Sequence, residues 1–132
     1  MINLEWVQHR SGVHQMFPST TGISDGRGNT LVTSYAVLRP DGNWSLLLVN
    51  RDENNPHEIR VVFDDADHKQ HFFFGPVAFV TFGAAQYVWH DQGANSFADP
   101  DGPPVGTTLP GGPNAAYLLP KASITVLRGR VQ

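Results

Sequence analysis

One stretch, residues 33–64, constrains the fold more than any other part of the chain. It predicts three short strands joined by two turns. The first turn, at 39–43, is Arg-Pro-Asp-Gly-Asn, in which proline presets φ and Asp-Gly accepts positive φ. Residues 44–49 form an almost continuous apolar run, as in a strand that is covered on both faces. Because three strands cannot cover their own apolar face, a second sheet has to pack on them.

The remainder of the chain continues this pattern of short apolar runs and turns. Its 132 residues include 13 glycines and 10 prolines, which suits short strands and many turns better than helices. No window of ten or more residues has the 3.6-residue apolar period of a helix. Further strands are predicted at residues 4–7, 14–18, 72–74, 77–82, 86–90, 115–119 and 122–128. The sequence therefore predicts an all-β protein, a single antiparallel two-sheet β-sandwich of about eight short strands over residues 1–132.

Alternation within the predicted strands indicates which side chains enter the core. The residues expected to point inward are Leu46, Leu48, Ile59, Val61, Val80, Ile124 and Val126. The segment 91–114 is instead rich in proline and glycine, and it predicts a long loop. We expect this loop to rest on the flank of the sandwich through Phe97 and to touch a partner from its tip. Folding of the sandwich is then expected not to depend on it.

Composition limits which partners the chain is expected to bind and which chemistry it can carry out. The net charge is −3 with no basic block, which argues against binding to nucleic acid or to an anionic membrane surface. No apolar run approaches the roughly 18 residues of a membrane span, and we expect no signal peptide at Met1. The absence of cysteine excludes disulfides, thiol catalysis and thiolate metal sites. The compartment stays open, because a domain of a longer exported protein, extracellular or periplasmic, would have the same composition.

Three segments, taken in order, resemble one family of domains. They are Ser-Tyr-Ala-Val-Leu-Arg-Pro-Asp-Gly at 34–42 with Trp-Ser-Leu-Leu-Leu-Val-Asn-Arg-Asp at 44–52, Phe-Val-Thr-Phe-Gly at 79–83 with Gln-Tyr-Val-Trp at 86–89, and Tyr-Leu-Leu-Pro-Lys-Ala-Ser-Ile-Thr-Val-Leu-Arg-Gly at 117–129. Together they resemble the C-terminal β-sandwich that follows the catalytic barrel in many xylosidase-like and arabinofuranosidase-like glycoside hydrolases. The resemblance covers most of residues 31–129. It implies a non-catalytic accessory domain that packs on and stabilises a catalytic barrel, in cis or in trans, since the catalytic carboxylates of such enzymes lie on the barrel.

The residues themselves predict no catalytic group. Glycoside hydrolysis needs two carboxylates held about 5–10 Å apart, and most of the 12 acidic residues lie in predicted turns. Glu5 and Glu58 fall in predicted strands, but neither has an acidic partner nearby in the sequence. No Gly-x-Ser-x-Gly motif marks a nucleophilic serine. We therefore expect the chain by itself not to be an enzyme and to need no cofactor.

Histidines and aspartates offer weak candidates for a metal site. His68 and His71 are three residues apart beside Asp65 and Asp67, but no helix holds that spacing. Asp-Pro-Asp-Gly at 99–102 supplies oxygen ligands but lacks the glutamate that completes a calcium loop. Solvated turn residues explain both patterns, so no metal site is predicted. His90-Asp91 suggests either a hydrogen-bonded pair or merely the end of a strand.

Aromatic residues support an alternative function. Trp6, Trp44, Tyr87 and Trp89 could form a flat platform for sugar rings, although aromatic residues also fill sandwich cores. Trp44 opens a core strand and is expected to be buried, whereas Trp89 precedes the long loop and is expected to be exposed. Trp89 and Tyr87 are thus the candidate ligand-binding residues of a freestanding carbohydrate-binding module. Exposed coplanar aromatic rings would favour that reading, and a broad apolar patch would favour docking on a barrel.

Overall fold

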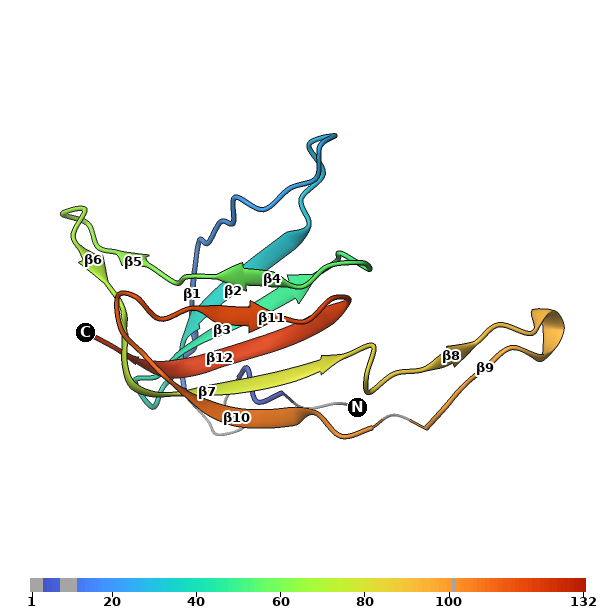
Figure 1. Cartoon of the computed structure of the whole chain (residues 1–132). Helices are drawn as coiled ribbons and strands as arrows, with labels where there is room; N and C mark the ends of the chain where they lie inside the picture. The colour runs from blue at the N-terminus through green and yellow to red at the C-terminus, as the bar shows by residue number, and fades with distance from the viewer. Residues whose placement is uncertain (1–3, 8–11, 101) are drawn as a thin grey trace.

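The computed structural model describes residues 4–7, 12–100 and 102–132. Its strands are β1 (Gln15–Phe17), β2 (Val32–Leu38), β3 (Trp44–Asn50), β4 (His57–Ile59), β5 (Phe63–Asp64), β6 (Gln70–His71), β7 (Phe73–Gly83), β8 (Trp89–His90), β9 (Phe97–Ala98), β10 (Val105–Pro110), β11 (Tyr117–Leu119) and β12 (Ser123–Val131). A single 3-10 turn, η1 (Gly93–Asn95), lies between β8 and β9. The protein is all-β, as the sequence predicts (Figure 1). In the part of the chain described, no helix is long and apolar enough to span a membrane.

The main layer is an antiparallel sheet of six strands in the order β1-β2-β3-β12-β7-β10. The β2–β3 hairpin confirms the turn predicted at 39–43. Gly42 has a φ of 80°, and its N–H donates to the Arg39 carbonyl at 3.0 Å. The Asp41 carboxylate accepts the Asn43 N–H at 2.9 Å. Local turn chemistry thus places β2 and β3 side by side, and β12 pairs with the other edge of β3.

The second layer is a small sheet of two strands, β11 and β4, which lies over one face of the main sheet (Figure 1). The predicted three-stranded meander is therefore wrong, because the third strand leaves the sheet that holds β3. The buried Asn50 side chain explains this crossing. Its Nδ2 donates to the Pro120 carbonyl at 2.9 Å and to the Asn55 carbonyl at 3.3 Å. These bonds direct the chain out of the main sheet, and Ile59 then pairs with Tyr117.

The core fills the space between the two layers. Its buried apolar members are Val32, Ala36, Leu46, Leu48, Phe73, Val77, Phe79, Tyr117, Leu119 and Leu127. Ile59 and Val61 pack against this core, as predicted, and so does the half-buried Trp44. Val80, Ile124 and Val126 were expected in the same core, but the sheet register places them on the opposite face. Alternation along a strand separates two faces without showing which face is covered by the second layer.

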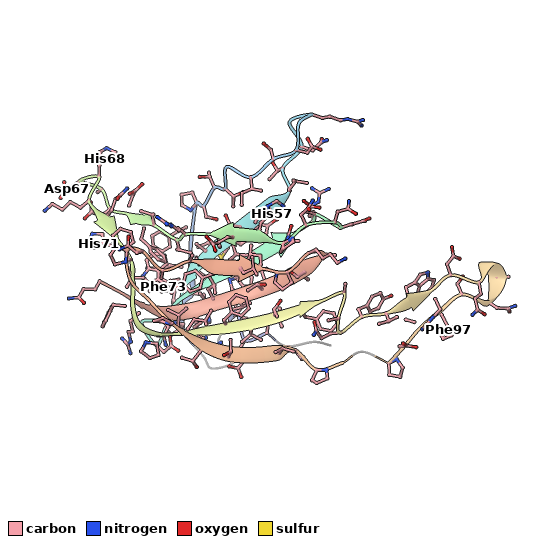
Figure 2. The ribbon with its side chains drawn as sticks, viewed as in Figure 1. His57, Asp67, His68, His71, Phe73 and Phe97 are labelled. Carbon is pink, nitrogen blue, oxygen red and sulfur yellow. The ribbon has the colours of Figure 1, made fainter. Side chains whose placement is uncertain are left out.

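The segment predicted as a loop at 91–114 forms strands instead. β8 and β9 make a two-stranded ribbon, here called the arm (residues 84–100, 102 and 103), which extends away from the sandwich (Figure 1). β10 then pairs with β7 along six residues and forms an edge of the main sheet. Phe97 lies on the arm and not on the flank of the sandwich (Figure 2). On the arm its ring stacks on the His90 ring, with centroids 4.7 Å apart. The predicted loop is therefore wrong for the β10 part, and this pairing argues against the expectation that folding does not depend on the segment, which unfolding of a replacement variant tests.

Candidate functional site

The arm carries the two aromatic residues proposed as ligand-binding. Tyr87 and Trp89 are two positions apart in the first half of the arm, where Tyr87 follows a turn and Trp89 opens β8. They are 46% and 55% exposed, which confirms the exposure expected for Trp89. The other two aromatic candidates lie elsewhere. Trp44 faces the core, and the Trp6 Nε1–H donates to the Ser45 carbonyl at 3.3 Å. Two of the four aromatic residues, Tyr87 and Trp89, are therefore exposed on the arm.

An apolar surface lies on the side of the main sheet that is turned away from β4 and β11. We call it the outer face, and define it by Tyr35, Leu47, Val49, Val80, Phe82, Ile124 and Val126, which share one side through the register of β2, β3, β12 and β7. Tyr35 and Ile124 are exposed, and all the others except Val126 are half-buried. Strands β3 and β7 are thus apolar on both sides and β12 on its outer side, although among the described residues the small sheet lies over the inner side alone.

The N-terminal residues cover one end of the outer face. The Glu5 carbonyl accepts hydrogen bonds from Arg39 at 3.2 Å and from Arg128 at 3.1 Å. The Glu5 carboxylate also lies 3.3 Å from the Arg128 guanidinium. At that end Val37 and Ser45 are fully buried. In the part of the chain that the structure describes, no segment lies over the other end, where Ile124 is exposed.

A shallow depression joins the open end of the outer face to the arm. It encloses about 340 Å³, and Val49, Phe82 and Ile124 of the outer face line it together with Tyr87 at the base of the arm. Its walls are mostly apolar side chains and small residues, and the charged residue at its edge is Arg51. An apolar surface of this shape, flat with a projecting ribbon at one end, is typical of a docking surface rather than of a catalytic cleft.

Three histidines are paired with aspartates, and each pair closes a turn or ribbon. The Nε2 atoms of His57, His71 and His90 lie 2.8, 2.9 and 2.9 Å from carboxylate oxygens of Asp52, Asp65 and Asp99. Of the two readings of His90-Asp91, the structure agrees with the strand end, since β8 ends at His90. Neighbouring residues on a strand point to opposite faces, and the partner of His90 is Asp99, which directly follows β9 on the other side of the arm.

The described residues contain no group of three or more histidine or acidic side chains that could hold a metal ion. His68 and His71 lie in the β5–β6 hairpin near Asp67 (Figure 2). His68 occupies a turn position with a φ of 60°, whereas His71 is bonded to Asp65. In the Asp-Pro-Asp-Gly segment at 99–102, the weak candidate for calcium, Asp101 lies outside the described residues, and Asp99 is bonded to His90.

The Asp52–His57 pair shows how such a pair fixes a turn. One carboxylate oxygen accepts the N–H groups of Asn54 and Asn55 at 2.9 and 3.0 Å, and the other contacts His57. Hydrogen bonds from Asn54 and His57, the two largest causes, lower the pKa of Asp52 from 3.8 to about 2. A carboxylate held by backbone donors in this way fixes a turn. The turn is the one that carries the chain from the main sheet to β4.

This geometry predicts how stability depends on pH. Because the folded-state pKa of Asp52 lies below the unfolded value, its carboxylate stabilises the fold above about pH 4. We expect that contribution to fade as the pH falls from about 4 towards 2. Urea unfolding at pH 7, 4 and 2.5 checks this, with Asp52→Asn expected to lose part of the acid sensitivity. Asp67→Asn, in the exposed β5–β6 turn, is the control. Equal acid sensitivity in Asp52→Asn and the unmodified chain would contradict the assignment.

Sequence reasoning missed the outer face as a functional surface. The available signal was the continuous apolar character of residues 44–49 and 77–82, which predicts coverage on both faces of the strands. Comparison with known proteins adds no relative: no family model, no curated protein and no solved structure matches the chain.

Proposed function

We propose that the chain is a non-catalytic accessory domain of a barrel-type glycoside hydrolase, and that it docks on the catalytic barrel through the outer face. The observation that carries the docking part is the apolar outer face, on which Tyr35 and Ile124 are exposed and which the described N-terminal residues cover at the Ser45 end. Exposed apolar surface of this extent is costly unless a partner covers it. The identity of the partner is supported by the sequence resemblance in residues 31–129 alone.

The position of the acidic residues agrees with a non-catalytic role. The carboxylates of Asp25, Asp41, Asp52 and Asp65 each accept backbone N–H groups of their own turns. Such turn-capping carboxylates hold structure, and the hydrogen bonds keep their pKa values low, unlike the raised pKa that a general acid requires. The reaction would then be supplied by the barrel.

Production with and without a barrel tests the proposal. The barrel is the one encoded in the same reading frame or in an adjacent gene. We expect the chain alone to leave aryl glycosides and polysaccharides intact, and the barrel to unfold at a higher temperature when the chain is present. Two results would contradict the proposal: turnover by the chain alone that disappears when one acidic residue is replaced, and a barrel whose unfolding temperature is unchanged by the chain.

A second candidate function is carbohydrate binding by the arm. It is favoured by one observation, the exposure of both Tyr87 and Trp89 on the arm. Affinity electrophoresis in gels that contain soluble polysaccharides tests it. Retardation that is lost in Trp89→Ala and kept in Phe97→Ala, on the opposite face of the arm, would favour the binding module. Equal mobility of the unmodified chain in every gel would dismiss it.

A further inference from the structure

The second layer of the sandwich is much narrower than the first, and a groove opens beside it. The small sheet has two strands, whereas the main sheet has six. The groove encloses about 960 Å³ between the segment 17–23 and the segment 58–66. Ala36, Trp44, Leu46 and Leu48 of the main sheet line it, and Ile59, Val61 and Phe63 line the side formed by β4 and its continuation. This groove lies on the opposite side of the main sheet from the outer face, so it is distinct from the proposed docking surface.

One border of the groove is an unpaired strand edge. β4 pairs with β11 on one side, and among the described residues no strand pairs with its other edge. That edge faces the stretch that follows β1 (Figure 1). Exposure alternates residue by residue from His57 to Asp64, so the chain stays extended beyond the three residues of β4 itself. A free edge presents N–H and C=O groups that another extended chain can pair with.

The charged residues along the groove favour a basic occupant. Three carboxylates, Glu58, Asp64 and Asp65, lie along it with the cation Arg60, and Asp65 is already paired with His71, whose Nε2 lies 2.9 Å away. The opposite wall, which includes Ser19, Thr20 and Thr21, carries no charge. The arm of a second copy fits this border poorly, because residues 84–103 contain aspartates and no lysine or arginine. Charge complementarity therefore points to a segment that carries lysine or arginine.

We propose that the groove binds an extended polypeptide segment as an added strand on the free edge of β4. Alternate apolar side chains of the segment enter the groove over Leu46 and Leu48, and its basic residues lie beside Glu58 and Asp64. This is recognition by strand addition, in which backbone pairing gives affinity and alternate pockets give specificity. The extended stretch 57–64 offers eight residues, which at about 3.3 Å each accommodate a segment of about seven.

A designed peptide tests the proposal with the full chain. The probe is the end-blocked peptide Lys-Val-Thr-Val-Thr-Val-Lys, titrated by NMR up to about 1 mM. We expect saturable binding, with amide shifts concentrated in residues 57–64. N-methylation of every interior amide should weaken binding at least about tenfold, because backbone pairing is lost. The double variant Glu58→Lys and Asp64→Lys should lose at least about tenfold for this peptide and prefer the same peptide with glutamate ends.

The control variant is Asp91→Lys, a change on the arm, which should bind the peptide as the unmodified chain does. Absence of binding up to about 1 mM, shifts outside the groove, or equal binding of the N-methylated peptide would each overturn the proposal. A concentration-dependent dimer that Glu58→Lys dissociates would place a second copy in the groove, and this would also overturn it. None of these outcomes depends on the outer face or on a glycoside hydrolase.

Discussion

Phe73→Ala is expected to lower the free energy of unfolding by about 3–5 kcal/mol. The Phe73 side chain is 2% exposed and meets the Phe63 ring edge-on, with centroids 5.1 Å apart. It also lies over Gly129, where a Cβ would stand 3.1 Å from the Phe73 ring. Truncation leaves a cavity that neither neighbour can fill. Since small domains have only about 5–15 kcal/mol of stability, the unfolding temperature should fall by roughly 10–20 °C.

The next residue provides the matched control. Phe74 has the same side chain but is 45% exposed on the other side of β7. Phe74→Ala should therefore cost less than about 1 kcal/mol, since a surface change removes few contacts. Calorimetry and urea unfolding of both variants give the comparison. Equal losses in the two variants would mean that the strand register around residue 73 is wrong by one residue.

Replacing residues 96–110 with a short Gly-Ser linker is expected to abolish cooperative unfolding. The replacement removes β10, which pairs with β7 from Val105↔Thr81 to Pro110↔Pro76. It also removes Leu109, which packs against the core, and the Pro110 carbonyl, which lies 3.4 Å from the Tyr117 hydroxyl. The edge of β7 would then be open to pairing with other chains, so aggregation should accompany the loss of structure.

Shortening only the arm distinguishes the contribution of the arm to stability from that of β10. Gln86 already accepts a hydrogen bond from the Gly102 N–H at 2.8 Å, so the ends of the arm lie close together. Replacing residues 88–100 with Asn-Gly should leave the unfolding temperature within a few degrees, because an isolated two-stranded ribbon adds little stability. Circular dichroism melts of both replacements make the comparison. A cooperative melt after loss of 96–110 would show that β10 is dispensable, contrary to the structure.

The fold was predictable from the sequence where local chemistry decides it. The β2–β3 hairpin follows from its Pro-Asp-Gly turn, and β11 and β12 follow from their apolar runs. β10 was missed because glycine and proline interrupt it, and such residues are tolerated on an edge strand. The partner of β4 was missed because the buried Asn50 turn redirects the chain through contacts with Pro120, 70 residues away. Sequence patterns do not report contacts over that separation.

The candidate surfaces were less predictable than the fold. Exposure of Trp89 could be predicted from its place before a proline-rich and glycine-rich segment, and the structure confirms it. The outer face could not be located, because a period of two residues cannot tell which of two apolar faces the second layer will cover. Ile124 and Val80 were assigned to the wrong face for this reason. The groove beside β4 depends on how many strands each layer contains, which only the assembled topology gives.

Docking through the outer face is tested most directly by titrating the chain into the separately produced barrel and measuring heat. Ile124→Lys places a charge at the exposed centre of the outer face, and Leu118→Lys places one at a comparably exposed apolar site on β11. We expect Ile124→Lys to weaken binding by at least about tenfold, because a charge would be buried without a partner, and Leu118→Lys to bind as the unmodified chain does. Equal binding of the two variants, or no binding by the unmodified chain, would contradict docking through this face.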